Sequence, residues 1–167
     1  MNVGKAIETR RSIRKYKSVP IEPEKLKAVT EAFRLAPSAK NLQNWKLYVV
    51  TDPEKKRMLW EASPGKQTML TEAPAVLVAT GSSQGVMTSG HRVDSIDLSI
   101  AMSFSMLAAW EQGLGTCWMA NYTEDGVRKA LGLPDDISIA AIMPIGYADE
   151  EVEARPRKDE TEVIEII

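Results

Sequence analysis

The residues best suited to chemistry in this sequence form a cluster of cations near the N-terminus. Arg10, Arg11 and Arg14, with Ser12 among them, follow a short predicted helix, and residues 10–17 (RRSIRKYK) hold five cations and no carboxylate. Guanidinium groups match phosphate oxygens in two-pronged hydrogen bonds, and a hydroxyl adds a further donor. Because the net charge of the whole chain is −2, the cluster indicates either a site for a bound anion or a basic face exposed to solvent.

A second candidate is the polar segment from Pro37 to Trp45 (PSAKNLQNW), between a predicted helix and a predicted strand. Polar side chains on a loop that is held by rigid elements can hydrogen-bond the edge of a heterocycle or a sugar-like chain. An ordinary helix-to-strand connection has the same composition, so both interpretations stay open.

Three common chemistries are disfavoured by residue type and motif. A zinc site needs clustered cysteines and histidines, and the sequence has one of each, Cys117 and His91. A Ser-His-Asp triad would have to use His91, which lies in a stretch rich in glycine and serine, and no nucleophile elbow occurs. Neither a P-loop motif nor the dinucleotide-binding G-x-G-x-x-G is present.

The elements that must position these residues follow from periodicity, caps and breakers. Asn2 can cap a first helix, Pro20 and Pro23 bracket the start of a second, and Pro37 should end it. Asp52-Pro53 restarts a helix, and Thr123 caps a short helix that ends at Gly132. The predicted helices are Val3–Thr9, a segment from Pro23, a segment from Pro53, Asp94–Gln112 and the segment after Thr123. The predicted strands are Trp45–Val50, Ala75–Thr80, Thr116–Ala120, Ile137–Tyr147 broken by Pro144 and Gly146, and Thr161–Ile167.

Two segments carry further expectations. Small residues along Asp94–Gln112, which Gly113 should end, suit either a core helix or a seam between two chains. The alternating segment Thr161–Ile167 would be an exposed edge unless another strand pairs with it, and Gly81–Gly90 is expected to be a loop. Helices and strands mix without strict alternation, which favours an α+β sheet, partly antiparallel and wrapped by helices.

Bulk properties narrow the class of protein. The 167 residues fit a single domain, 1–167, with 44% hydrophobic and 26% charged residues. A lone cysteine, Cys117, excludes an intrachain disulfide, and Met1–Arg14 lacks the apolar run of a signal peptide, so a cytoplasmic location is expected. The weakly polar stretch Ile96–Trp110 is expected to be too short and too polar to cross a membrane. The net charge of −2 disfavours nucleic acid as a partner.

Several short motifs, in order along nearly the whole chain, resemble those of the nitroreductase family. Arg10 to Tyr16 resembles its R-R-S-x-R-x-[FY], Ala36 to Trp45 its A-P-S-x-x-N-x-Q-P-W, and Gly113 to Trp118 its G-L-G-[ST]-x-W. Leu133-Pro134, Ile145-Gly146-Tyr147 and the basic pair Arg157-Lys158 fall where the family has comparable residues. Each motif is short, but their order is specific.

The resemblance implies an α+β fold with a mostly antiparallel sheet, a long central helix and a C-terminal strand exchanged in a homodimer. It also implies FMN at the subunit interface, NADH or NADPH as electron donor, and a small-molecule electron acceptor such as a nitroaromatic, a quinone or a flavin. The protein residues would bind and tune the flavin without acting as catalytic acid or base, because the bond-making is the cofactor's.

The resemblance also implies residue roles. The FMN phosphate and the pyrimidine edge would be held by Arg10, Arg11, Ser12 and Arg14, with Arg157 and Lys158 completing the phosphate site. Arg14 is the expected cation beside the reduced ring. The partner chain would bring Pro37, Ser38, Ala39 and Asn41 to the flavin. The segment Trp118, Met119, Ala120 and Asn121 would pass beside the ring, and Gln67 is a further candidate for a ring contact.

This chain departs from the family pattern at Asn44, where the family has proline, and at Ala120-Asn121, where many members have a glycine or a glutamate-glycine pair. The segment before Asp94 is also short where longer members insert helices over the pocket. These departures keep two other hypotheses open: a flavin carrier or redox-sensing module with little turnover, and a small protein that binds anions or nucleic acid through residues 10–17.

Overall fold

The computed structural model describes residues 2–82 and 85–167. Its centre is a sheet with strand order β1-β2-β4-β3, in which every neighbouring pair is antiparallel. The strands are β1 (Trp45–Val50), β2 (Ala75–Ser82), β3 (Gly115–Thr116) and β4 (Ile137–Gly146). A parallel bridge joins Ser12 to Thr116. The expected α+β class, with a mostly antiparallel sheet and a long helix, is confirmed.

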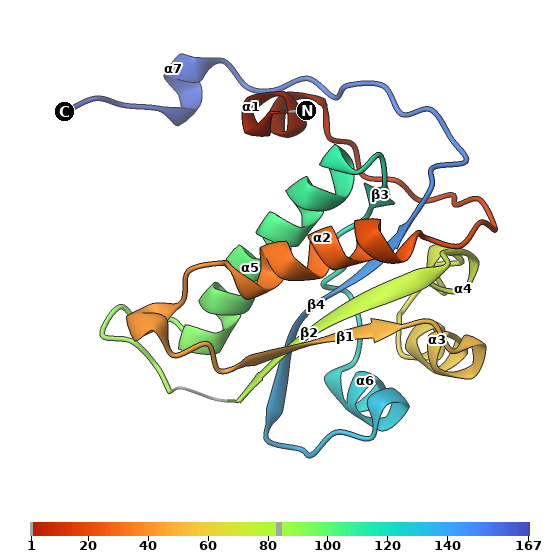
Figure 1. Ribbon diagram of the computed structural model, residues 1–167. Helices are drawn as coiled ribbons and strands as arrows, with labels where there is room; N and C mark the ends of the chain where they lie inside the picture. The colour runs from red at the N-terminus through yellow and green to blue at the C-terminus, as the bar shows by residue number, and fades with distance from the viewer. Residues whose placement is uncertain (1, 83–84) are drawn as a thin grey trace.

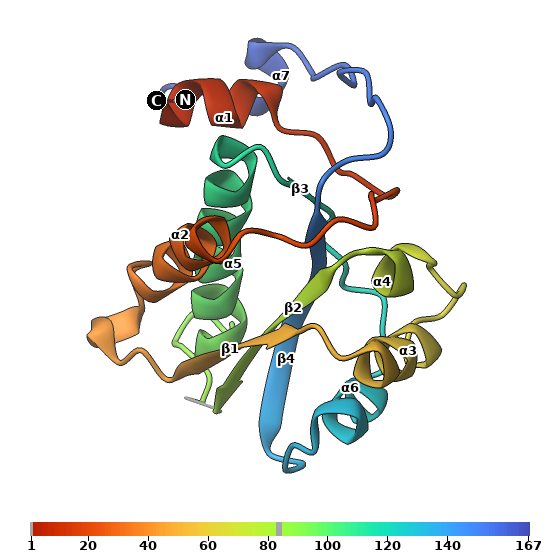
Figure 2. The same cartoon turned by 45° about the vertical axis from the view of Figure 1, so that its right-hand side comes forward.

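Helices cover both faces of this sheet (Figures 1 and 2). The helical elements are α1 (Val3–Thr9), α2 (Pro23–Arg34), the 3-10 turn η1 (Ala39–Asn41), α3 (Pro53–Glu61), α4 (Met69–Glu72), α5 (Val93–Glu111), α6 (Glu124–Leu131) and α7 (Glu160–Val163). Helices α2 and α5 pack on one face, whereas α3, α4 and α6 pack on the other.

Strand β2 shows how the sequence produces these two layers. Ala75, Leu77 and Ala79 belong to the core cluster under α2 and α5, while Val76 and Val78 belong to the cluster on the opposite face. Successive side chains of a strand point to opposite faces. A strand that is covered on both sides must therefore be apolar throughout, which is why β2 reads as a continuous hydrophobic run.

Several predicted boundaries rest on local caps: those of Asn2 and Asp52 are confirmed, whereas Thr123 precedes α6 without a side-chain cap hydrogen bond. The side chain of Asn2 accepts the Lys5 N–H at 2.9 Å, and that of Asp52 accepts the Lys55 N–H at 2.8 Å. Helix α1 and strand β1 have the predicted bounds. Gly113 and Gly132 follow their helices at positive φ, +76° and +67°, where glycine avoids the steric cost of a Cβ.

Helix α5 begins one residue before the predicted Asp94 and ends one residue before Gln112. It is longer than the Ile96–Trp110 stretch, and by length and composition alone it is long and apolar enough to cross a membrane. The packing of α5, however, is that of a core helix. Its buried residues pack against α2 and the sheet, as those of a core helix do.

Two predicted strands differ from the observed ones. In place of the predicted strand Thr116–Ala120, the structure has the two-residue strand β3, Gly115–Thr116. Met119 adds an isolated bridge to Ile142. Strand β2 continues through Ser82, so Gly81 and Ser82 belong to it. Of the loop predicted over Gly81–Gly90, residues 83–84 lie outside the described residues.

The expected break of β4 at Pro144 and Gly146 is wrong, because the strand runs without interruption from Ile137 to Gly146. The carbonyl of Pro144 accepts the Cys117 N–H at 3.4 Å, on the side where the short strand β3 is already ending. In a strand, the N–H and C=O of one residue point the same way. The donor that proline lacks therefore faces a position where little strand pairing remains to be lost.

The predicted C-terminal strand Thr161–Ile167 is also wrong. Glu160–Val163 forms helix α7, and the remaining residues are extended and exposed. Asp159 and Glu162 form a reciprocal capping box that starts the helix. Exchange of the C-terminal segment between two chains stays a prediction.

Candidate functional site

The segment of residues 10–17, called here the cation segment, is suspended by its backbone between two parts of the fold. On one side the Ile13 N–H donates to the Thr116 carbonyl at 2.9 Å. The Ile13 side chain is buried against Gly115, where an added Cβ would lie 2.5 Å from Ile13 Cγ1. Gly115 therefore allows the cation segment to approach β3 closely.

On the other side, the cation segment pairs with the chain that leaves β4. The Lys17 N–H donates to the Tyr147 carbonyl and the Asp149 N–H to the Lys15 carbonyl, both at 2.9 Å, with an antiparallel bridge between Tyr16 and Ala148. The hydroxyl of buried Tyr16 donates to the Ile13 carbonyl at 2.7 Å, and burial, the main cause, raises the Tyr16 pKa. Tyr16 is therefore a neutral structural residue.

A cavity of about 290 Å³, the cation pocket, opens beside this segment. The residues that line it are Glu8, Arg10, Arg11, Ser12, Arg14, Val152, Glu153, Ala154, Arg155 and Arg157. The structure thus brings together the predicted residues of the N-terminal cluster and Arg157, 143 positions beyond Arg14 in the sequence. Lys158 does not line the pocket. Arg155 does, and sequence reasoning missed it although it stands two residues before Arg157 in the segment R-P-R.

The electrostatics of the cation pocket suit an anion. Burial, and then the neighbouring positive charges of Arg157 and Arg11, lower the pKa of Arg10. A shift with these causes shows that the positive charges repel one another here, although Glu8 and Glu153 also line the pocket. A bound phosphate would relieve that repulsion and accept several charge-assisted hydrogen bonds.

A second cavity, of about 560 Å³, adjoins the first and shares Arg14 with it. Gln67 lines this second cavity together with Thr68, Met69, Glu72, Asp149 and Glu150. Arg14 therefore lies at the junction of a cationic cavity and a second one whose lining holds Arg14 and Lys15 together with the carboxylates of Glu72, Asp149 and Glu150. The structure thus places Gln67 and Arg14 on the lining of the same cavity.

The segment from Trp118 to Asn121 does not line either cavity. Met119 is buried in the core cluster with Ile142, and its backbone N–H and C=O are both hydrogen-bonded to Ile142, at 3.0 and 3.1 Å. Trp118 is partly buried against the cluster under α2 and α5, and Ala120 and Asn121 are exposed. The Asn121 carbonyl accepts the Ser63 hydroxyl at 3.2 Å.

The segment of residues 37–45, called here the polar loop, lies at the opposite end of α5 from the cation segment (Figure 1). The carboxylate of Asp97, in the first turns of α5, accepts the Ala39 N–H with both oxygens at 3.1 Å. The Ser38 hydroxyl accepts the Gln43 N–H at 3.0 Å. Pro37, Ser38, Ala39 and Asn41 are therefore not brought to the cation pocket within one chain, since a 19-residue helix such as α5 spans about 28 Å.

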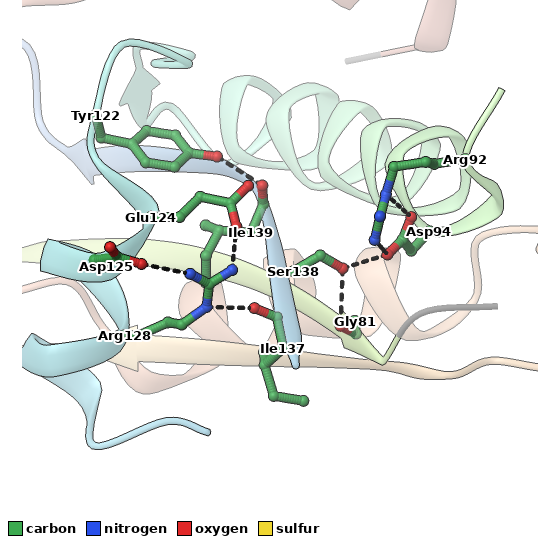
Figure 3. A network of polar contacts seen from close by, with 10 residues as sticks. All are labelled: Gly81, Arg92, Asp94, Tyr122, Glu124, Asp125, Arg128, Ile137, Ser138 and Ile139. Atoms are coloured by element: carbon green, nitrogen blue, oxygen red, sulfur yellow. Dashed lines mark hydrogen bonds and ion pairs between the residues drawn. The ribbon is translucent and has the colours of Figure 1, made fainter. Parts of the chain in front are cut away.

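Figure 3 shows what holds this end of α5 to the sheet. Buried Asp94 accepts hydrogen bonds from the Arg92 guanidinium, at 2.7 and 3.1 Å, and from the Ser138 hydroxyl. Burial raises the Asp94 pKa, but the hydrogen bonds and the charge of Arg92 outweigh it, so the pKa lies below its ordinary value. Asp94 therefore remains ionised at neutral pH and links α5 to β4.

A second part of the same network fixes α6 to the sheet. The Arg128 guanidinium donates to the Ile137 carbonyl at 2.7 Å and pairs with Glu124 and Asp125 (Figure 3). Within residues 2–82 and 85–167, no group of three or more His, Cys, Asp or Glu side chains could hold a metal ion.

Comparison with known proteins identifies the family. The model of the nitroreductase family matches residues 7–65 and 61–147. The chain belongs to the nitroreductase family. A curated relative named NADH dehydrogenase, from Thermus thermophilus, is 33% identical, with 85% of this chain and 84% of the relative covered. The cation segment, the polar loop and β3 all lie inside the residues that match the family.

Solved structures of the nitroreductase family have the same fold. A protein described as an FMN-dependent nitroreductase, from Clostridium difficile R20291, superposes with a TM-score of 0.83 at 35% identity and covers 95% of this chain and 96% of that one. A nitroreductase family protein from Clostridium novyi NT superposes with a TM-score of 0.86 at 29% identity, over 90% and 87% of the two chains. Both similarities extend over nearly whole chains.

Proposed function

We propose that this chain is an FMN-dependent oxidoreductase that takes a hydride from NADH or NADPH and reduces a second, small-molecule acceptor. Family membership supports the class of reaction. Similar proteins are named FMN-dependent nitroreductase and, in Vibrio harveyi, NADPH-flavin oxidoreductase; the latter is 29% identical, with 93% of this chain and 70% of the relative covered. The single observation that carries the proposal for this chain is the cation pocket.

The residues of the pocket fit the phosphate end of FMN. Arg10, Arg11 and Arg157 offer guanidinium donors, and the Ser12 hydroxyl adds a fourth group, in a cavity where positive charges repel one another. Phosphate carries close to two negative charges and accepts bidentate pairs from arginine. Lys158, next to Arg157 but outside the lining, would add to the positive field rather than to direct contact.

The adjoining cavity fits the ring end. Arg14 and Gln67 would contact the polar edge of the isoalloxazine, and Arg14 would place a fixed positive charge where the reduced ring carries negative charge. The backbone of Trp118, Met119, Ala120 and Asn121 would pass beside the ring. When bound, FMN would supply the hydride chemistry, and the protein would bind it, orient it and tune it.

The protein would act as a homodimer, because the two halves of the proposed site lie far apart within a single chain. The polar loop, with Pro37, Ser38, Ala39 and Asn41, lies at the far end of α5 from the cation pocket. A second chain in the opposite orientation would bring its polar loop to the flavin. Apolar side chains at the C-terminus are also exposed, Ile164 at 57% and Ile166 at 96%, and would be covered by a partner.

The test is an absorbance spectrum of purified protein that has been loaded with FMN, desalted and then treated with NADH or NADPH under nitrogen. Retained flavin that bleaches with a pyridine nucleotide is the expected result. Turnover of nitroaromatic, quinone and free-flavin acceptors then identifies the substrate class. Loss of flavin on desalting at micromolar protein would contradict the proposal.

The second candidate function is an FMN carrier or redox-sensing module. It is favoured by Ala120-Asn121, which are exposed and stand where many family members have a glycine or a glutamate-glycine pair. Flavin that is retained but reacts with acceptors no faster than free FMN would select this function. Flavin-dependent turnover well above that of free FMN would reject it.

A further inference from the structure

Glu150 occupies an unusual position between the cation segment and the two cavities. It follows the chain 147–149 that pairs with the cation segment, and it lines the cavity that contains Arg14 and Gln67. One oxygen of its carboxylate, Oε1, accepts the backbone N–H groups of both Arg14 and Lys15, the latter at 3.1 Å. These hydrogen bonds join residues more than 130 positions apart in the sequence.

Two consecutive amides that converge on one oxygen mark a change of direction in the backbone, because consecutive N–H groups of an extended strand point to opposite sides. The contacts of the cation segment show where the change occurs. Ser12 and Ile13 are bonded to Thr116, next to Gly115, whereas Tyr16 is bridged to Ala148. Arg14 and Lys15 thus lie at the point where the segment passes from one partner to the other, and Glu150 binds that point.

The same contacts explain how a carboxylate can lie beside an anion site. Its charge is directed at two backbone amides, which form charge-assisted hydrogen bonds and offset it locally. Without Glu150, both amides would lose their partner, and the backbone that carries the Arg14 side chain would be held only by its neighbours. Arg14 lines both cavities, so its direction matters for both.

We propose that Glu150 is a positioning residue for the cofactor site: it fixes the backbone of Arg14 and Lys15 so that the Arg14 side chain reaches the junction of the two cavities. This inference rests on the proposed function, because it assigns Glu150 an effect on FMN. It does not make Glu150 a ligand of FMN, since its effect passes through the backbone of Arg14.

Two substitutions separate the hydrogen bonds of Glu150 from its charge. Glu150→Gln keeps an oxygen that can accept both amides but removes the negative charge, whereas Glu150→Ala removes both. Glu151→Ala is the matched control, because it removes an exposed carboxylate from the next position. The FMN dissociation constant is measured by quenching of flavin fluorescence, and amide exchange of residues 14 and 15 is measured on full-length, cofactor-free protein.

We expect Glu150→Ala to raise the FMN dissociation constant about tenfold and to speed exchange of both amides, since two charge-assisted hydrogen bonds are lost. Glu150→Gln should restore slow exchange and bring the dissociation constant within about threefold of wild type. Glu151→Ala should match wild type in both. Should Glu150→Ala fail to fold, as judged by its thermal melt, Glu150→Asp replaces it, with a carboxylate one methylene too short and the same direction of change.

Three results would overturn the inference. Wild-type FMN affinity in Glu150→Ala would show that the hydrogen bonds of Glu150 do not influence cofactor binding. Equal losses in Glu150→Gln and Glu150→Ala would show that charge, and not the hydrogen bonds, matters. Unchanged amide exchange in Glu150→Ala would show that the backbone is not held by Glu150. Failure of the wild type itself to bind FMN is a distinct outcome, which rejects the proposed function and this inference with it.

Discussion

The two ends of helix α5 organise two different kinds of polar site. At its C-terminal end, the cation segment is suspended by main-chain hydrogen bonds from Thr116 and from residues 147–149. Its Arg11 and Arg14 side chains line the cation pocket and also donate to the nearby carbonyls of Glu8, Arg10 and Ser12. At its N-terminal end, side chains form the attachment, with Asp94 bonded to the sheet and Asp97 to the polar loop. One end presents charge and the other presents amides and hydroxyls. The proposed site needs both, and in the proposed homodimer it would draw them from two chains.

The largest effect is expected at the cationic end. Arg10→Ala should raise the FMN dissociation constant about a hundredfold, because a partly buried guanidinium contributes charge-assisted hydrogen bonds that alanine cannot replace. Fluorescence titration measures the change. Arg34→Ala is the control, because Arg34 is an exposed arginine paired with Glu31 on α2, and it should leave the affinity unchanged. Equal affinities in the two variants would remove the cation pocket from the proposed site.

A substitution at Gly115, against which the cation segment packs, should lower the stability of the fold. In Gly115→Ala the new methyl group would meet Ile13 at 2.5 Å, so Ile13 and the cation segment must move. We expect the free energy of unfolding to fall by about 1–3 kcal/mol, together with weaker FMN binding. Gly4→Ala is the control, because Gly4 lies in exposed helix α1 with its nearest neighbour at 3.6 Å. Urea unfolding of both variants checks the difference.

Substitution of Asp97 tests the polar end, alone and together with Arg10→Ala. Asp97→Ala removes the acceptor of the Ala39 N–H and should weaken FMN binding about tenfold. In a heterodimer of one Arg10→Ala chain and one Asp97→Ala chain, one site carries both defects and the other carries neither.

Doubly tagged heterodimers should therefore bind one FMN per dimer with wild-type affinity, as isothermal titration calorimetry would show. If both halves of a site came from the same chain, every site would carry one defect, and no wild-type binding would appear in the heterodimer.

The smallest effect concerns pH at the polar end. The pKa of Asp94 is lowered in the folded state, so the ionised carboxylate stabilises the fold above the ordinary aspartate pKa of about 4. This contribution is lost as pH falls through the lower, folded pKa. Asp94→Asn should cost about 1 kcal/mol at pH 7, a modest value because Arg92 is half exposed. The gap in urea-unfolding free energy should narrow towards pH 3, and a constant gap would contradict the assignment.

The sequence predicted best those helices and strands whose limits are set by neighbouring residues in the chain. Asn2, Asp52 and the prolines at the first helical positions set helix starts, and the apolar run Ala75–Thr80 predicted the strand that the structure shows buried on both faces. The prediction was wrong where contacts with residues distant in the sequence determine the structure. Thr161–Ile167 alternates like a strand, but the chain offers it no strand to pair with, so the capping box of Asp159 and Glu162 prevails. Pro144 stays inside β4 because the neighbouring strand ends beside it.

The candidate site divides in the same way. Residue types predicted an anion site around Arg10 to Arg14, and the order of the motifs added Arg157. Neither could identify Arg155 or Glu150, because their roles depend on where the chain after β4 passes the cation segment. The spatial separation of the polar loop from the cation pocket was equally invisible, since sequence spacing does not tell at which end of a helix a loop lies.

The shape of the polar loop has a consequence for binding energetics. Lys40, Asn41 and Gln43 all adopt left-handed backbone conformations, with φ of 52°, 54° and 53°. Such conformations cost roughly 1–2 kcal/mol each for residues with a Cβ, and Asp97 and Ser38 help to hold them. Folding has therefore already removed the loop's conformational entropy. A ligand that meets this loop has little backbone freedom left to freeze, and more of its contact energy appears as affinity.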